Sequence, residues 1–215
     1  MVTVIANTRR RFVGIFNTGG ITMRLSAIEF KAMNNPLRRF IQKHLEFRNF
    51  RWLGLTDKNK KMLEIGCGSG YGAVLLSTLE PKSYIGIDLM PEQIALTGQR
   101  PSSGYEFKVM DASDMREIHS KSKDIIVIFG ILHHIPRWRE VVQECRRVLA
   151  SGGKLFVEEP NGSIVKYFDR LFHWGHPDSD FSLLEFEREL VSNGFNIVRK
   201  RRILGFGTYY AQMRG

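Results

Sequence analysis

Apolar and polar positions follow two alternating periods between residues 61 and 160. Short apolar runs predict strands at 61–66, 83–88, 106–110, 123–130 and 154–158. Between them, apolar residues at helical spacing predict helices at 71–80, 92–99 and 138–149. The run Ile125–Phe129 is apolar throughout, which is typical of a strand buried on both faces. This alternation predicts an α/β fold with a parallel sheet and helices on both of its faces.

The end of the chain departs from this alternation. Ser182 and Glu185 have the spacing of a capping box, which predicts a helix that ends at Gly194. Two further strands are predicted at 195–204 and 208–213, with only three residues between them. Because so short a link joins only antiparallel strands, we expect the chain to close with an antiparallel pair.

A basic amphipathic helix is predicted at 36–50, ahead of the sheet. Asn35 is a favourable N-cap, and Pro36 suits the first helical position. One stripe of this helix is apolar and consists of Leu37, Phe40, Ile41 and Leu45. The stripe either packs on the core, closes over a substrate, or lies on a membrane.

Composition and charge narrow the class of protein. The chain has 215 residues, of which 43% are hydrophobic and 25% charged, and this suits one soluble domain with a full core. Residues 1–60 hold 12 Lys or Arg and 3 Asp or Glu, so most of the net charge of +10 lies there. Such a region favours an anionic partner, although a solvated basic surface explains it equally well. The two cysteines have no metal-ligand spacing and indicate a reducing, cytoplasmic location.

A glycine-rich loop follows the first predicted strand. Met62–Gly72 has the pattern of a strand, a turn with glycines at 66, 68 and 70, and the start of a helix. Such glycines let the backbone turn sharply against a ligand, and the first N–H groups of the helix favour an anionic or polar one. Gly68–Ala73 fits the dinucleotide pattern G-x-G-x-x-G/A, while Glu64–Gly70 fits the E-x-G-x-G-x-G loop that binds S-adenosylmethionine (SAM). A turn without a ligand is the third interpretation.

Polar residues at the ends of the next strands extend this candidate site, because ligands of open α/β sheets bind at the carboxyl ends of the strands. Asp88 ends the second strand, and its carboxylate can accept two hydrogen bonds from ribose hydroxyls. Asp111 and Ala112 follow the third strand, where a side-chain acceptor and a backbone N–H suit the edge of adenine. A capping role remains open for each aspartate.

With these motifs, residues 60–215 resemble the class I SAM-dependent methyltransferases. The string at 132–135, Leu-His-His-Ile, is similar to the ubiquinone/menaquinone-biosynthesis type and related small-molecule methyltransferases. The resemblance implies a Rossmann-like seven-stranded sheet of order 3-2-1-4-5-7-6, with strand seven antiparallel, and SAM as the cofactor. The cofactor-binding residues that it implies are Glu64, Gly66, Cys67, Gly68, Gly70, Asp88, Leu89, Met90, Asp111, Ala112 and Gly130. A dehydrogenase is disfavoured, because the chain has no Tyr-x-x-x-Lys pair and no room for a second large domain.

The acceptor side is expected beyond the fourth and fifth strands. His133 and His134 lie beside the expected methyl position, where a histidine of near-neutral pKa can deprotonate a phenol, enol or hydroxyl. Capping or packing is the alternative for both. Residues 160–181 are rich in aromatic side chains and are expected to cover an apolar or aromatic acceptor, with Tyr167 and Trp174 as contacts. Glu159 is either a second polar contact or solvated.

The sequence therefore predicts an enzyme that transfers a methyl group from SAM to a small apolar or aromatic acceptor, quinone- or lipid-like. The alternatives are an RNA methyltransferase that uses the basic arm, and a non-catalytic binding partner. RNA is disfavoured because no Asn/Asp-Pro-Pro-Tyr/Phe string follows the fourth strand. We expect no metal, a monomer or homodimer, and a cytoplasmic location with or without membrane contact through the basic helix. The expected parts are 1–32, a flexible arm or a stretch before the true start; 33–60, the helical cap and linker; and 61–215, the methyltransferase domain.

Overall fold

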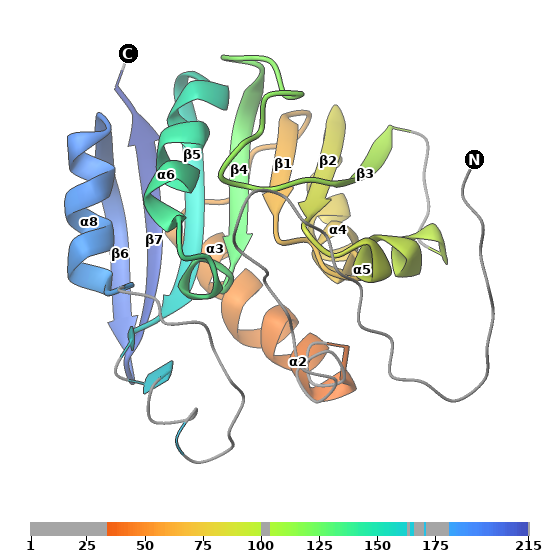
Figure 1. Cartoon of the computed structure of the whole chain (residues 1–215), viewed down its shortest axis with the longest axis horizontal. Helices are drawn as coiled ribbons and strands as arrows, with labels where there is room; N and C mark the ends of the chain where they lie inside the picture. The colour runs from red at the N-terminus through yellow and green to blue at the C-terminus, as the bar shows by residue number, and fades with distance from the viewer. Residues whose placement is uncertain (1–33, 100–103, 163, 166–169, 171–180, 215) are drawn as a thin grey trace.

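A twisted seven-stranded sheet organises the protein. The computed structural model describes residues 34–99, 104–162, 164, 165, 170 and 181–214. The strand order is β3-β2-β1-β4-β5-β7-β6 (Figure 1), and β7 runs antiparallel to both β5 and β6 while the other neighbours pair in parallel. The strands are β1 Lys61–Ile65, β2 Ser83–Asp88, β3 Tyr105–Val109, β4 Lys123–Phe129, β5 Leu149–Pro160, β6 Phe195–Ile203 and β7 Phe206–Met213. The predicted fold class, with its strand order, is confirmed.

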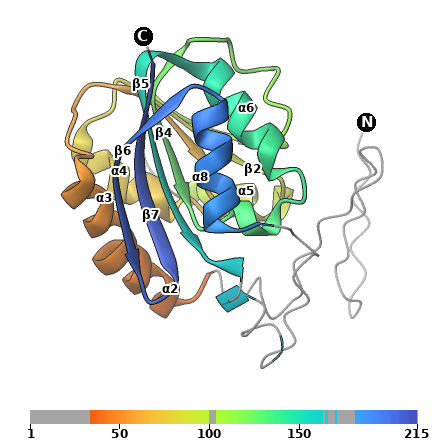
Figure 2. The same ribbon diagram turned by 90° about the vertical axis from the view of Figure 1, so that its left-hand side faces the viewer.

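Helices cover both faces of this sheet. Figure 2 shows α6 and α8 on one side and α3 and α4 on the other. The α-helices of the domain are α4 Tyr71–Leu76, α5 Pro91–Ala95, α6 Trp138–Val148 and α8 Leu183–Ser192. Short 3-10 turns extend or connect them: η2 Ser77–Leu79, η3 Leu96–Gln99 and η4 Leu132–His134. Within the described residues, no helix has the length and apolar content needed to cross a membrane.

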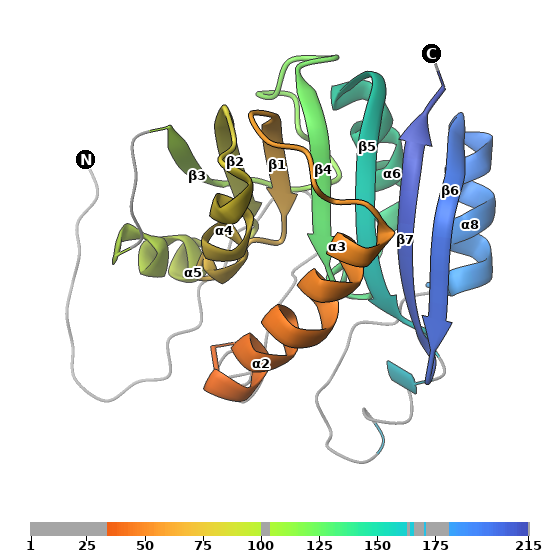
Figure 3. The same ribbon diagram turned by 180° about the vertical axis from the view of Figure 1, so that it is seen from behind.

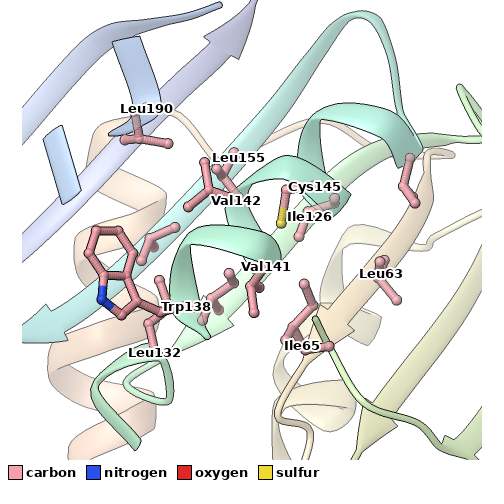
Figure 4. Packing of buried hydrophobic residues seen from close by; sticks show 14 of the residues in the cluster. Leu63, Ile65, Ile126, Leu132, Trp138, Val141, Val142, Cys145, Leu155 and Leu190 are labelled. Carbon is pink, nitrogen blue, oxygen red and sulfur yellow. The ribbon is translucent and has the colours of Figure 1, made fainter. Parts of the chain in front are cut away.

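The core has two layers because β4 is buried on both faces. Ile126 faces α6, where Val141, Val142 and Cys145 pack (Figure 4), and Ile128 belongs to the same cluster. Ile125, Val127 and Phe129 belong to the opposite layer, under α3 and α4. This arrangement explains the uninterrupted apolar run that predicted the strand, since every position of it is removed from water.

The N-terminal helix is continuous but changes character along its length. It runs from α2 Pro36–Ile41 through a π-helical turn, η1 Gln42–Phe47, into α3 Arg48–Leu53, and it ends at Gly54, whose φ is 116°. Figure 3 shows α2 near the end of the sheet to which β4 and β5 point, and α3 against the sheet. In α3, Phe50 and Leu53 are fully buried, and the Phe50 ring lies 5.0 Å from that of Phe129.

The first half of this helix does not pack its apolar stripe on the core, which was one of the three roles expected for the stripe. Leu37, Phe40 and Leu45 are 64%, 59% and 58% exposed, so packing of the predicted apolar stripe on the core is wrong for these residues. The buried positions of η1 are polar instead, namely Gln42 and Glu46. A π-helical turn adds a residue to the turn and rotates the side chains that follow, which sequence periodicity at 3.6 residues does not anticipate.

Two element boundaries also differ from the prediction. β5 begins at Leu149, directly after α6, because Leu149 already pairs with Lys123 ahead of a register shift. The turn between β6 and β7 is shorter than expected and consists of Leu204 and Gly205, with φ angles of 48° and 78°. Positive φ at both central residues is the geometry of a two-residue hairpin turn whose twist matches that of the strands.

Candidate cofactor and acceptor site

The glycine loop joins β1 to α4 in a left-handed path. Gly66, Gly68 and Gly70 have φ angles of 72°, 51° and 79°, a region that residues with a Cβ atom rarely adopt. A Cβ on Gly66 would lie 2.8 Å from the Ile131 side chain, so this glycine also permits close packing. A Cβ on Gly68 would meet only Gln93, at 3.9 Å. The backbone at Gly68 therefore faces open space, which suits a ligand lying against the peptide.

Asp88 connects this loop to the end of β2. Its Oδ2 accepts a hydrogen bond from the Gly68 N–H at 2.9 Å, and its Oδ1 accepts one from the Met90 N–H at 2.9 Å. Burial raises the pKa of Asp88, and the two N–H groups oppose that shift. Each carboxylate oxygen has a second lone pair, so the carboxylate retains capacity for ribose hydroxyls. The predicted roles of Asp88, Leu89 and Met90 stay predictions.

Glu64 supports the loop from within the sheet. Its Oε2 accepts a hydrogen bond from the Tyr84 hydroxyl, and a Cβ on Gly72, in the first turn of α4, would overlap its carboxyl group. Burial raises the pKa of Glu64 to about 8. The carboxyl therefore lies beneath the start of α4, and contact with the methionine part of the cofactor stays a prediction.

Asp111 is held by two partners. Its Oδ1 accepts hydrogen bonds from the Ser113 N–H at 2.8 Å and the Ser113 hydroxyl at 2.6 Å, which close a local turn; no helix follows in the described segment between β3 and β4, so Asp111 is not a helix N-cap. Its Oδ2 pairs with Arg137 at 2.7 Å. This ion pair, between the segments that follow β3 and β4, was not predicted, because no local pattern connects residues 26 positions apart. The neighbouring Ala112 is buried.

Glu159 organises the turn that carries the two histidines. Its Oε1 accepts hydrogen bonds from the N–H groups of Ile131 at 2.8 Å and Leu132 at 2.7 Å. Its Oε2 lies 2.8 Å from Nδ1 of His133 and accepts a longer bond from the backbone N–H of that residue. The side chain is fully buried, so the expectation of a solvated Glu159 is wrong. The carboxylate faces the histidine turn and positions it, where the sequence suggested a direct acceptor contact.

His133 and His134 occupy η4 and are both buried. Their ring centroids are 4.1 Å apart. Gly130, just before the turn, has a φ of 59° and donates its N–H to the Glu158 carbonyl at 2.7 Å. The structure therefore brings the predicted histidines to the carboxyl ends of β4 and β5, and it adds the partner that fixes their position.

Some predicted residues fall outside the described part of the chain. They include Tyr167 and Trp174, most of the expected lid at 160–181, and the arm at 1–32. Across the described ranges, no group of three or more His, Cys, Asp and Glu side chains is arranged to hold a metal ion.

The fold and the candidate site together indicate which class of cofactor the protein binds. An open α/β sheet with a glycine-rich loop after β1 and an aspartate at the end of β2 is a nucleotide-cofactor fold. Residues 63–157 match the family described as a methyltransferase domain. This region is therefore a methyltransferase domain, its fold is that of SAM-dependent methyltransferases, and its cofactor is SAM. The open backbone at Gly68 and the remaining acceptor capacity of Asp88 fit that cofactor.

Named relatives agree with this assignment. A phthiotriol/phenolphthiotriol dimycocerosates methyltransferase of Mycobacterium leprae is 34% identical over 131 residues, which are 60% of this chain and 47% of the relative. A ubiquinone biosynthesis O-methyltransferase of Xanthomonas oryzae is 29% identical over 104 residues, or 47% of this chain and 43% of the relative. A human thiol S-methyltransferase is 31% identical over 137 residues, covering 57% and 55%. The chain spans about half the length of the curated relatives it matches.

Solved structures confirm the fold. A chain from the complex of the Haloferax volcanii Trm112 methyltransferase activator with a methyltransferase superposes with a TM-score of 0.73 at 15% identity. The match covers 87% of this chain and 98% of that chain. A SAM-dependent methyltransferase from Aquifex aeolicus gives a TM-score of 0.68 at 15% identity, covering 88% and 100%.

Proposed function

We propose that the protein transfers a methyl group from SAM to a small apolar acceptor, quinone- or lipid-like. The observation that carries this proposal is the enclosed histidine turn. His133 and His134 are both buried at the carboxyl ends of the central strands, and Glu159 fixes the first of them. Such a site suits a small acceptor that leaves water on binding, in contrast to an open basic groove.

The chemistry required of this chain is modest. When bound, SAM supplies an electrophilic methyl group, so the protein aligns the acceptor and, for an acceptor that carries a proton, removes it. When Glu159 is ionised, Nδ1–H of His133 donates to its carboxylate, and the basic lone pair of this imidazole is then on Nε2. His133 is then a general base whose orientation is fixed by Glu159, as a third residue often orients a catalytic histidine in other enzymes.

The named relatives support an apolar acceptor. Two of them are named for phthiotriol dimycocerosates and ubiquinone biosynthesis, and the human one for thiols; a fatty-acid O-methyltransferase of Mycolicibacterium smegmatis is also 36% identical, over 98 residues. Apart from the thiols, these compounds share long hydrocarbon or isoprenoid character, although the chain matches only parts of those proteins. We infer the acceptor class from this common chemistry and leave the individual compound to experiment.

A methyl-transfer assay tests the proposal directly. Purified protein is incubated with methyl-labelled SAM and cell extract split into lipid, small-molecule and RNA fractions. We expect label in the lipid or small-molecule fraction, and loss of that label in His133→Ala. Label in the RNA fraction alone would establish the alternative. A His133→Ala variant with the rate and pH profile of the wild type would remove the histidine from the proposed chemistry.

The exposed face of the N-terminal helix supports a membrane partner for this activity. Leu37, Phe40 and Leu45 are more than half exposed, and Lys43 and Arg48 are exposed beside them. Apolar side chains flanked by basic ones bind the interface of an anionic bilayer, where a lipid-like acceptor resides. We infer that the protein reaches its acceptor at such a surface.

Vesicle sedimentation tests this contact. We expect binding to vesicles containing phosphatidylserine, weaker binding to phosphatidylcholine alone, and loss of binding in the double variant Leu37→Ser, Phe40→Ser. Leu184→Ser is the matched control, because Leu184 is 53% exposed on α8. Equal sedimentation of the double variant and the wild type would contradict a membrane role for the helix.

A further inference from the structure

The hairpin between β6 and β7 ends in an apolar turn that is open to water. Leu204, the first residue of the turn, is 88% exposed. Ile203 and Phe206, which pair across the hairpin, are 42% and 41% exposed. Leu204 also has a φ of 48°, a conformation in which two-residue turns favour asparagine, aspartate or glycine. Three contiguous apolar side chains at such a turn indicate a contact site.

The other residue of the turn is held against the body of the protein. The Gly205 carbonyl accepts a hydrogen bond from the Asn161 N–H at 2.7 Å, directly after the end of β5. A Cβ atom on Gly205 would overlap the Ile164 side chain. Gly205 therefore packs inward while Leu204 projects into solvent. The tip is preorganised, so it can meet a partner at little cost in conformational entropy.

The tip lies at the end of the sheet that carries the histidine turn. In the register between β5 and β7, Gly207 lies opposite Glu159, which fixes the position of His133. Phe206 lies one position further out, opposite Pro160. Figures 1 and 3 show α2 at this same end of the sheet. Two exposed apolar elements, distant in sequence, therefore border the end of the molecule at which the acceptor is expected.

The strand that leads to the tip is basic. Residues 199–202 are Arg, Lys, Arg and Arg, and all four are exposed. Two of them pair with Glu187 of α8. Within the part of the chain that the structure describes, Arg199 and Arg201 form no ion pair. The apolar tip is thus flanked by positive charge that is available to an anionic partner.

Arg201 connects this strand to the N-terminal helix. Its Nη1 donates a hydrogen bond to Oδ1 of Asn49 at 2.9 Å. Its guanidinium group lies 5.4 Å from the centroid of the Trp52 ring, a cation–π contact, and Trp52 is itself 63% exposed. Because these contacts fix the hairpin relative to the helix, the two elements meet a surface as one unit.

We propose that the β6–β7 hairpin tip is a second membrane contact, which inserts Leu204 into the interface of an anionic bilayer while the N-terminal helix binds the same surface. Like charges along the edge strand β6 oppose pairing with a second copy of the chain and favour a negatively charged surface. Two contacts at one end of the sheet orient the histidine turn towards the lipid. The inference rests on the proposed function, since it extends the membrane contact of the helix to a second element.

A fluorescent label on Leu204→Cys tests the insertion. Cys67 and Cys145 are both buried, so a nitrobenzoxadiazole dye reacts at the introduced thiol. With vesicles of equal parts phosphatidylcholine and phosphatidylserine, we expect a blue shift and a rise in emission. Val198→Cys is the matched control, because Val198 is 47% exposed on the same strand. It lies about 20 Å further from the tip, at about 3.3 Å per residue, whereas interfacial segments enter a bilayer by about 5–10 Å. Its label should stay in water.

Leu204→Asn separates membrane binding from stability. Asn-Gly is a favoured sequence for this turn, so the variant should resist urea at least as well as the wild type. Its affinity for the same vesicles should nevertheless fall about 10-fold, because an apolar side chain is lost from the interface. Unchanged affinity, or an unshifted spectrum of the Leu204→Cys label on vesicle-bound protein, overturns the inference.

Three other results distinguish this inference from its neighbours. A blue shift that grows with protein concentration in the absence of vesicles would assign the tip to a second copy of the chain and overturn the inference. Loss of binding in Leu37→Ser, Phe40→Ser with unchanged binding in Leu204→Asn would do the same and leave the helix as the membrane contact. Vesicle binding is measured without SAM or acceptor, so a blue shift at Leu204→Cys supports the inference even where the methyl-transfer assay fails.

Discussion

The cofactor side and the acceptor side of the candidate site hold their carboxyl groups by different means. On the cofactor side, Asp88 and Asp111 each accept a hydrogen bond from a backbone N–H two residues further along the chain, at Met90 and Ser113. On the acceptor side, the partners of Glu159 lie 26 to 28 positions away, in the turn after β4. Each aspartate on the cofactor side thus combines a local turn with a distant contact, to Gly68 or Arg137, whereas these partners of Glu159 are all distant.

This difference has an energetic consequence. Loss of a side-chain cap from a local turn disturbs one loop. Loss of Glu159 disturbs the junction between β5 and the histidine turn, because its fully buried side chain joins the two. Unpaired N–H groups in a buried site cost far more than the same groups at the surface. We therefore expect substitutions on the acceptor side to lower the stability of the protein, and those on the cofactor side to lower affinity for SAM first.

Glu159→Ala should have the largest effect. The substitution leaves two backbone N–H groups and Nδ1 of His133 without their acceptor in a buried site. We expect the free energy of unfolding to fall by about 3 kcal/mol, measured by urea denaturation. Glu159→Gln retains one carbonyl oxygen for the N–H groups of Ile131 and Leu132, so it should lose less. A Glu159→Ala protein of wild-type stability would remove the contrast between the two sides.

Asp88→Ala should produce the next largest change, and in a different observable. It removes the acceptor that connects the glycine loop to β2, so we expect affinity for SAM to fall by about 100-fold in calorimetry. Urea unfolding should change little in comparison with Glu159→Ala. Asp114→Ala is the control, because the Asp114 side chain forms an ion pair with Arg116 at the surface. Unchanged SAM binding in Asp88→Ala would contradict the ribose assignment.

The cofactor side and the acceptor side each contain a buried carboxyl group of raised pKa, which should make the stability of the protein depend on pH. Burial raises the pKa of Glu64, on the cofactor side, from 4.5 to about 8, and that of Glu159 likewise to about 8. Between these values the unfolded carboxyl is ionised while the folded one keeps its proton, so unfolding releases protons. Stability is therefore greatest near pH 5 and falls as the pH rises towards 8, by at most about 1.4 kcal/mol per pH unit for each group.

Urea unfolding at several pH values between 5 and 8 measures this slope. Glu64→Gln keeps a carbonyl acceptor for the Tyr84 hydroxyl and removes the titration, so its stability should fall less steeply with pH than that of the wild type. Parallel curves for the two proteins would mean that Glu64 does not hold its proton in the folded state.

The contrast between local and distant contacts also explains which parts of the fold and site could be predicted from the sequence. The glycine loop and the positions of Asp88 and Asp111 at strand ends could be predicted from short motifs and periodicity, and the strand order from the resemblance to the class I SAM-dependent methyltransferases. The burial of Glu46 depends on a π-helical turn, and the role of Glu159 on the register between β4 and β5. Neither leaves a pattern over a few consecutive residues. Arg137 was missed for the same reason, since its partner Asp111 is 26 positions away.

Arg137→Ala should have the smallest effect and tests the boundary between the two sides. The Asp111–Arg137 pair joins the segment after β3 to the one after β4, but Arg137 is 46% and Asp111 32% exposed. Exposed ion pairs contribute between about 0.2 and 1 kcal/mol, and Ser113 still holds Oδ1 of Asp111 in the variant. We expect SAM affinity within about 2-fold of the wild type, and a difference that disappears in high salt. A loss as large as that of Asp88→Ala would mean that this long-range contact is part of the cofactor site.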